Sequence, residues 1–270
     1  LIKVLFENIK GKVGIVRPTF EEYPNRLKPE QIVTYQAQCP NFSYSADDLM
    51  TYFADKDIES LLLINPDNPT GNYIPYADCL RLADWCQQRN ILFVLDESFI
   101  DFSVEHPTFF KNDILEQYSN LVVIKSISKS YGVPSLRLGI LATSNVDIMT
   151  IIRRSVSIWN INSFAEFFLQ ILGKYEASYQ QAMEEFRAER ARFVAELHKV
   201  SFLRVLPSEA NYLLCEVKQP HTPRELAIRL LKDYDILIKD CTSKCNAPYI
   251  RIAVRDTVDN NRLIDAFSQL

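Results

Sequence analysis

Residues 125–139 read Lys125-Ser-Ile-Ser-Lys-Ser-Tyr-Gly-Val-Pro-Ser-Leu-Arg-Leu-Gly139 and stand between two apolar runs. This segment carries an amine at Lys129, several hydroxyls and a guanidinium at Arg137. Two upstream loops share its character: residues 65–71 read Asn-Pro-Asp-Asn-Pro-Thr-Gly, and residues 96–99 read Asp-Glu-Ser-Phe. Each loop follows a short, continuously apolar run, which is typical of a strand buried on both faces. The pattern therefore predicts strands that end in polar, chemically equipped loops.

Apolar runs and helical patterns alternate over the first two-thirds of the chain, which predicts an α/β fold with a mostly parallel sheet. The predicted strands cover residues 13–16, 32–35, 61–64, 91–95, 121–124 and 138–141. Helices are expected at 1–9, after the cap-like Ser45, and from Pro75 to about Arg89. The helix at 1–9 has no capping residue before it, so we expect the chain to begin inside an element of a longer polypeptide.

The character of the sequence changes near Gly173. A charged helical pattern runs from 174 to 200 and is followed by a smaller α+β unit. Its predicted strands cover 202–205, 212–217, 236–238 and 249–254, and its helices cover 223–233 and the end of the chain from about 258. We therefore expect a large domain at 1–172 and a small C-terminal domain at 173–270.

Composition narrows the classes of function. The net charge is −4 and the pI is about 5.5, which gives no electrostatic case for nucleic acid. No apolar run reaches the ~18–20 residues of a membrane-spanning helix, and no signal peptide is recognisable. The six cysteines are widely spread, and the pair at Cys241 and Cys245 lacks further ligands nearby for a metal. These features favour a cytoplasmic protein with reduced thiols.

Three chemically distinctive residues follow neighbouring predicted strands. Asn68, Asp96 and Lys129 come after the runs at 61–64, 91–95 and 121–124. In an open α/β sheet, ligands bind beyond the carboxyl ends of the strands. We therefore expect these side chains to emerge at one edge of the sheet.

Their chemistry fits pyridoxal 5'-phosphate. The amine of Lys129 can condense with the aldehyde to a Schiff base and, once released, can move a proton at the substrate α-carbon. The carboxylate of Asp96 can keep the pyridine nitrogen protonated, and Asn68 can donate to the phenolic oxygen. Each residue also has an ordinary interpretation: a surface lysine, a turn-capping aspartate and an Asn-Pro turn.

Further residues complete the candidate site. Ser126, Ser128 and Arg137 offer hydroxyls and a planar guanidinium for the phosphate, although Ser128 has the strongest alternative, as a turn-bonding serine. Phe20 follows the strand at 13–16 and can stack on the pyridine ring, or else belong to the core. Arg251 can clamp a substrate carboxylate with two hydrogen bonds. Arg255 has the same chemistry in a weaker place, and a surface ion pair is the alternative for both.

As a set, these motifs resemble fold type I pyridoxal-phosphate enzymes, the class I and II aminotransferases, over nearly the whole chain. The likeness is greatest to the branch that holds histidinol-phosphate aminotransferase and threonine-phosphate decarboxylase. The resemblance implies that Lys129 is the Schiff-base lysine, Asp96 the ring-nitrogen partner and Asn68 the phenolic-oxygen partner. It also implies phosphate binding by Ser126 and Arg137, and a cytosolic homodimer that takes an amino acid and a 2-oxo acid.

Two departures from the family pattern bear on the site. Phe99 stands where many members carry a tyrosine whose hydroxyl bonds the phenolic oxygen of the cofactor, so we expect a less well tuned site. The family's N-terminal arm and glycine-containing phosphate turn should precede residue 1. We therefore expect the fragment to hold half a phosphate site and to bind the cofactor weakly or not at all.

Three functions remain open from the sequence. Transamination is the first, because Arg251 can hold the carboxylate near the ring plane and leave the α-hydrogen perpendicular. Decarboxylation of a phospho-amino acid uses the same groups with the carboxylate upright. A third hypothesis, of a different class, is a non-catalytic cofactor-binding module within a fusion protein.

Overall fold

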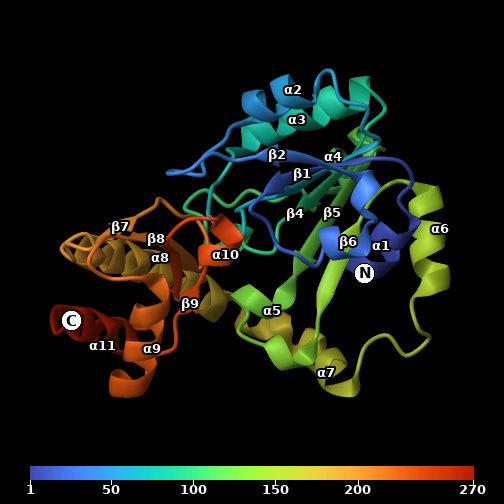
Figure 1. The fold of residues 1–270 in the computed structure, drawn as a ribbon. Helices are drawn as coiled ribbons and strands as arrows, with labels where there is room; N and C mark the ends of the chain where they lie inside the picture. Colours follow the sequence, from blue (N-terminus) through green and yellow to red (C-terminus); the bar gives the residue numbers. More distant parts are fainter.

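The computed structural model describes all 270 residues, and its larger sheet has the strand order β2-β1-β3-β4-β5-β6. The first five of these strands are parallel, and β6 pairs antiparallel with β5 at one edge (Figure 1). This arrangement confirms the predicted α/β class. The strands are β1 (Val13–Arg17), β2 (Ile32–Gln36), β3 (Ser60–Ile64), β4 (Leu92–Asp96), β5 (Leu121–Ser126) and β6 (Gly139–Ala142).

Helices cover both faces of this sheet. Alternate residues of its central strands enter two separate cores: Leu61 and Leu63 join one, whereas Leu62 and Ile64 join the other. The first core includes residues of α2 and α3, and the second lies against α1 and α6 (Figure 1). The helices of this part are α1 (Ile2–Asn8), α2 (Ala46–Phe53), α3 (Tyr76–Gln88), α4 (Asn112–Gln117), α5 (Ile127–Ser130), α6 (Val146–Ser155) and α7 (Ser163–Leu172).

The predicted cap at Ser45 is confirmed. Its hydroxyl accepts the backbone N–H of Asp48 at 3.2 Å, and the Asp48 carboxylate accepts the backbone N–H of Ser45 at 2.8 Å. This reciprocal capping box satisfies two of the donors that the first turn of α2 would otherwise leave free.

A second, four-stranded antiparallel sheet has the order β7-β8-β10-β9 and a core of its own. Its strands are β7 (Leu203–Val205), β8 (Tyr212–Val217), β9 (Lys239–Asp240) and β10 (Tyr249–Ala253). Its helices are α8 (Glu176–Leu197), α9 (Pro223–Tyr234), α10 (Thr242–Cys245) and α11 (Thr257–Ser268). Short 3-10 turns complete the chain: η1 (Pro24–Arg26), η2 (Pro29–Gln31), η3 (Ile100–Phe102), η4 (Pro134–Leu136) and η5 (Gly173–Tyr175).

One predicted strand was wrong. Residues 236–238 form no strand, and β9 comprises the next two residues, which pair with β10 through Lys239 and Arg251. Asp235 ends α9 in the left-handed conformation. The side chain of Ile238 then packs in the core of the second sheet, just before β9. The apolar run therefore reports burial rather than strand pairing. The proposed domain boundary at 172/173 stays a prediction.

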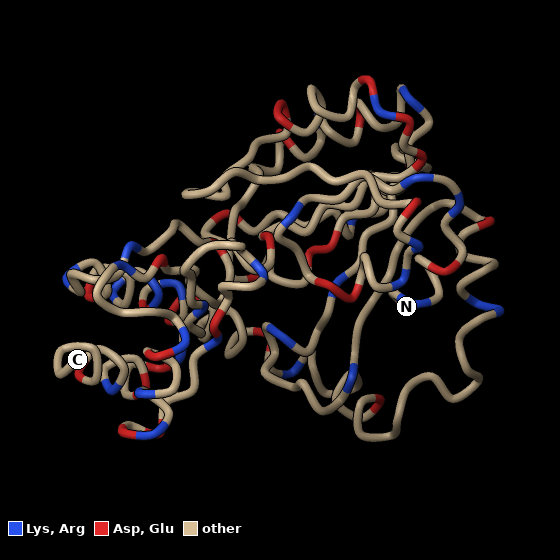
Figure 2. The backbone as a smooth tube through the Cα atoms, viewed as in Figure 1, with Lys and Arg blue, Asp and Glu red and all other residues tan.

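Helix α8 connects the two sheets. Arg190 is buried on this helix and donates to the carbonyls of Phe102, in the large sheet's loop, and Ala210, which precedes β8. It also pairs with Glu209 at 2.8 Å. Acidic and basic residues are interspersed along the whole backbone (Figure 2). No helix of the structure is both long and apolar enough to span a membrane.

Candidate active site

The predicted convergence at the carboxyl ends of β3, β4 and β5 is confirmed. These strands are parallel neighbours, and Ile64, Asp96 and Ile124 lie side by side across them. The loop that carries Asn68 follows β3, and α5, which carries Lys129, follows β5 directly. A cavity of about 200 Å³ between α1 and α6 lies at the opposite ends of these strands, beside Ser60 and Leu92, and is separate from this site.

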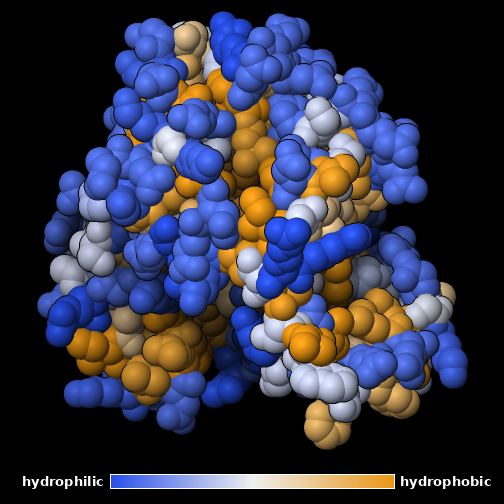
Figure 3. Space-filling view, turned by 90° about the vertical axis from the view of Figure 1, so that its right-hand side faces the viewer, coloured by the Kyte–Doolittle hydropathy of each residue, from blue (hydrophilic) through white to orange (hydrophobic).

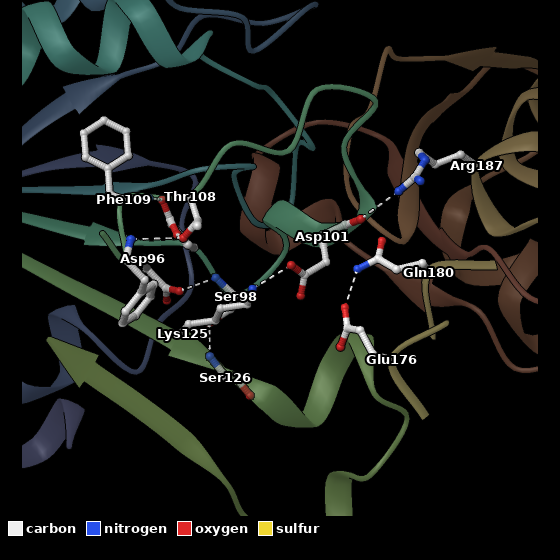
Figure 4. Close-up of polar contacts among 12 residues, drawn as sticks. Asp96, Ser98, Asp101, Thr108, Phe109, Lys125, Ser126, Glu176, Gln180 and Arg187 are labelled. Atoms are coloured by element: carbon white, nitrogen blue, oxygen red, sulfur yellow. Dashed lines mark hydrogen bonds and ion pairs between the residues drawn. The ribbon is translucent and has the colours of Figure 1, made fainter. Parts of the chain in front are cut away.

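Asp96 is buried and hydrogen-bonded through its carboxylate. Its side chain is 4% exposed, and both carboxylate oxygens accept hydrogen bonds. Ser98 donates its backbone N–H to Oδ1 at 2.8 Å (Figure 4). Tyr23 donates its hydroxyl to Oδ2 at 2.6 Å. Burial raises the pKa of Asp96, while these two donors and the charge of Lys129 oppose that rise.

Lys129 lies on α5 with an exposed side chain. Its Nζ atom is 5.9 Å from the centroid of the Phe99 ring. Phe99 in turn meets Tyr212 of β8 edge-on, with the ring centroids 5.2 Å apart. The rings of Phe99 and Tyr212 therefore lie between the amine and the second sheet.

The predicted phosphate-binding residues differ in their surroundings. Ser126 donates its backbone N–H to Ser98 Oγ at 3.0 Å, which ties β5 to the turn after β4 (Figure 4). Ser128 is buried, and its hydroxyl donates to the Leu138 carbonyl at 3.3 Å, the turn-bonding role weighed from the sequence. Arg137 is exposed, adopts φ 57°, and donates to the Pro134 carbonyl.

Asn68 and Arg251 come together from different sheets. Arg251 donates from Nη1 to Asn68 Oδ1 at 2.8 Å, and its guanidinium carbon lies 4.9 Å from the centroid of the Tyr212 ring. Tyr212 donates its hydroxyl to the Asp67 carbonyl at 2.6 Å, beside Asn68. Because the Asn68 oxygen is engaged by Arg251, its NH₂ group remains as the donor that can reach another ligand.

Phe20 lies at the same end of the sheet and is linked to the site by its contact with Tyr23. The Phe20 ring is 40% exposed and meets Tyr23 edge-on, with centroids 6.1 Å apart. Tyr23 itself contacts Asp96, so Phe20 borders the carboxylate side of the site.

Sequence reasoning missed several residues that shape this region. Tyr23 stands in the segment Pro18-Thr-Phe-Glu-Glu-Tyr23, three positions after Phe20, and that spacing after a strand was the available signal. Asp67 is fully buried beside Asn68, and burial raises its pKa to about 7 despite a hydrogen bond from Thr70. Lys125 pairs with Asp101 at 2.6 Å behind the site, with both side chains mostly buried (Figure 4).

Glu97, next to Asp96, makes structural hydrogen bonds. Its carboxylate accepts the hydroxyl of Thr108 at 2.5 Å and the backbone N–H of Phe109 at 2.7 Å. Burial raises the pKa of Glu97 to about 7, and these donors oppose the rise. The contacts hold the segment after β4 in place around Asp96.

The donor set fits pyridoxal phosphate. An accessible amine at Lys129, a buried carboxylate at Asp96 and an amide donor at Asn68 match the aldehyde, ring nitrogen and phenolic oxygen of that cofactor. The fold and this set define the class as fold type I enzymes that depend on pyridoxal phosphate.

Comparison with known proteins identifies the family. The model of the family "Aminotransferase class I and II" matches residues 1–267, and the chain belongs to this family. Threonine-phosphate decarboxylase of Salmonella typhimurium is 33% identical over 257 residues, which cover 93% of this chain and 69% of that protein. The crystal structure of histidinol-phosphate aminotransferase from Clostridium acetobutylicum has a TM-score of 0.88 and 27% identity, and the match covers 99% of this chain and 80% of that one.

A third relative is much longer than this chain. CMP-5'-(3-aminopropyl)phosphonate synthase of Streptomyces rubellomurinus is 30% identical over 273 residues, which cover all of this chain. The chain spans 43% of that relative's length. Members of this family depend on pyridoxal phosphate, and the family assignment confirms the resemblance seen in the motifs.

Proposed function

We propose that this chain breaks a bond at the α-carbon of a phosphorylated amino acid, and that the reaction is decarboxylation. The observation that carries the proposal is the contact of Arg251 with Asn68, which brings a substrate-binding cation to the cofactor side of the site. Relatives named as decarboxylases of serine phosphate and threonine phosphate support the choice of reaction and substrate.

The residues have distinct roles in this proposal. Pyridoxal phosphate, when bound, supplies an electron sink for the bond that breaks. Asp96 holds the ring nitrogen, Asn68 donates to the phenolic oxygen, and Ser126 with Arg137 binds the phosphate. Ser128, whose hydroxyl is engaged by Leu138, supports the turn between them.

Lys129 and Arg251 act on the substrate. Arg251 binds an acidic group of the substrate, and for decarboxylation the α-carboxylate must stand perpendicular to the cofactor ring so that it can leave as CO₂. The amine of Lys129 then delivers a proton to the α-carbon, which completes the exchange of a carboxylate for a hydrogen. Its exposed position beside Phe99 leaves it accessible to a substrate.

A second cation near Arg251 supports a substrate with two acidic groups. Lys244 lies on α10 with its side chain half-buried, and it forms no ion pair within the chain. Burial lowers the pKa of Lys244, and so does the nearby charge of Arg251, whereas Glu21 opposes the change. Two neighbouring cations favour a phosphate in addition to the carboxylate.

Transamination is the second candidate. Relatives named histidinol-phosphate aminotransferase favour it, and so does the ability of Arg251 to hold a carboxylate in place while the α-hydrogen leaves. Both reactions use the same residues and differ in which bond stands perpendicular to the cofactor ring.

A product assay separates the candidates. The protein, loaded with cofactor, is incubated with O-phosphothreonine, O-phosphoserine or histidinol phosphate, each with and without 2-oxoglutarate. Decarboxylation predicts CO₂ and a phosphorylated amine from O-phosphothreonine or O-phosphoserine without the oxo acid, whereas histidinol phosphate has no carboxylate and reports transamination alone. Formation of glutamate only when 2-oxoglutarate is present would establish transamination instead. Cofactor binding with no turnover of any amino acid would favour the non-catalytic module.

We further propose a cytoplasmic homodimer. Apolar side chains are exposed on α7 and the segment before it, including Ile158 at 92%, Trp159 at 90% and Phe164 at 80%. Figure 3 looks onto the side of the molecule that carries α6 and shows apolar side chains gathered in its lower part. Exposed apolar side chains in such numbers favour a protein interface. Six free cysteines favour a reducing compartment.

A further inference from the structure

Tyr23 is a fully buried tyrosine whose hydroxyl contacts the candidate ring-nitrogen partner. The residue is 0% exposed, and its ring packs against Phe6 of α1, with centroids 4.9 Å apart. Its backbone carbonyl accepts the N–H of Arg26 at 3.0 Å in the 3-10 turn η1. Ring and backbone are therefore both held, which aims the hydroxyl at a fixed point.

That point is Asp96 Oδ2, at 2.6 Å. The other oxygen, Oδ1, accepts the backbone N–H of Ser98, so each of the two carboxylate oxygens has a donor of its own. Buried carboxylates tend to protonate unless donors or positive charges stabilise the ionised form. An ionised Asp96 can form an ion pair with a protonated pyridine nitrogen, whereas a protonated Asp96 has no charge with which to do so.

Tyr23 has two properties that a general core tyrosine lacks. Its hydroxyl comes from the loop after β1, so it is independent of the β4 backbone that carries Asp96. Its neighbour Phe20 borders the same side of the site. A single short segment thus supplies an exposed aromatic ring and a buried donor to the carboxylate.

We propose that Tyr23 is a positioning residue that keeps Asp96 ionised and aimed at the ring nitrogen of pyridoxal phosphate. This inference rests on the proposed role of Asp96 in the function above. It assigns to Tyr23 no contact with the substrate or with the reacting atoms.

The test compares two ligands on one variant. Tyr23→Phe removes only the hydroxyl, and affinity is measured for pyridoxal phosphate and for its carbocyclic analogue, in which C–H replaces the ring nitrogen. A lost hydrogen bond to a charged group predicts about tenfold weaker binding of pyridoxal phosphate. Affinity for the analogue should stay within about twofold, because the analogue makes no ionic contact with Asp96.

Tyr118→Phe is the matched control. Tyr118 is also buried and donates to an aspartate, Asp84, at 2.8 Å, but it lies in the core beside α3. We expect this variant to bind both ligands as the wild type does. Urea unfolding of both variants reports any general loss of stability.

The outcomes separate the inference from the function on which it rests. Equal losses of affinity for both ligands in Tyr23→Phe would overturn the positioning role and leave a packing role. If the wild-type protein binds the analogue as tightly as pyridoxal phosphate, the proposed role of Asp96 fails first. Unchanged affinity for pyridoxal phosphate in Tyr23→Phe would overturn the inference alone.

Discussion

Asp96 and Arg137 are both assigned to the cofactor, yet the fold treats them differently. Asp96 is buried at the end of a central strand and is held by Tyr23 from a distant loop and by the backbone N–H of Ser98, two residues on. Arg137 is exposed after a 3-10 turn, and its guanidinium donates a hydrogen bond to the nearby Pro134 carbonyl. The attraction between a carboxylate and a protonated ring nitrogen is stronger in a buried, low-dielectric site. A guanidinium can bind phosphate through two hydrogen bonds even close to water.

The comparison extends to the whole site. Its acidic side, with Asp96 and Glu97, is buried and organised by the fold of the chain. Its cationic side, with Lys129 and Arg137, is exposed. Changes on the cationic side should therefore alter ligand binding and chemistry with little effect on folding, and changes on the acidic side should alter both.

The largest effect is expected at Lys129. Lys129→Ala removes the amine that transfers the proton and should lower kcat by about 100- to 10,000-fold. Because the side chain is exposed, the urea midpoint should stay unchanged. Lys174→Ala, an exposed lysine in η5, is the control. Wild-type kcat in Lys129→Ala would remove the amine from the mechanism.

Glu97 tests the buried acidic side through pH. Burial raises its pKa from 4.5 to about 7, so the folded state keeps a proton that the unfolded chain releases. The stability it contributes is complete below pH ~4.5 and is lost as pH rises through about 7. This loss should amount to about 3 kcal/mol in free energy of unfolding.

Urea unfolding of the wild type and of Glu97→Gln between pH 4.5 and 8 measures this contribution. The difference between the two curves should change across that range, because the variant has no titrating group at this position. Parallel curves would show that the pKa of Glu97 is the same in the folded and the unfolded protein, contrary to its burial.

Arg251 tests the cationic side from the second sheet. Arg251→Ala should lower kcat/KM by about 10- to 100-fold, because hydrogen bonds between charged groups contribute about 1.5–3 kcal/mol. Arg255→Ala is the matched control, since Arg255 pairs with Asp259 on the surface. Steady-state kinetics of both variants show which of the two arginines binds the substrate. Equal losses would reject the assignment of Arg251.

The smallest effect is expected at Phe99, between the two sides. Phe99→Tyr adds a hydroxyl next to Lys129 and should tighten cofactor binding by up to about tenfold, the value of one ordinary hydrogen bond. Phe102→Tyr packs towards Phe186 instead and should bring no gain. Absorbance titration with cofactor measures both variants. Weaker binding in Phe99→Tyr would show that the added oxygen lacks a partner.

Much of this site was accessible from the sequence because strand ends and loop chemistry are local properties. The continuous apolar runs before Asn68, Asp96 and Lys129 predicted parallel buried strands, and parallel strands bring their carboxyl ends together. The run at 236–238 misled for a related reason. An apolar run reports burial, and burial alone does not distinguish a strand from a coil that crosses a core.

The sequence by itself determined the sheet, the edge at which Lys129 and Asp96 emerge, and the residue types available there, since these follow from periodicity and from the chemistry of each side chain. Only the tertiary structure decided that Tyr23 bonds Asp96, that Ser128 turns to the Leu138 carbonyl, and that Arg251 reaches Asn68. The partners in these contacts lie up to 183 positions apart in the chain, and no local pattern records which distant donor a buried oxygen will meet.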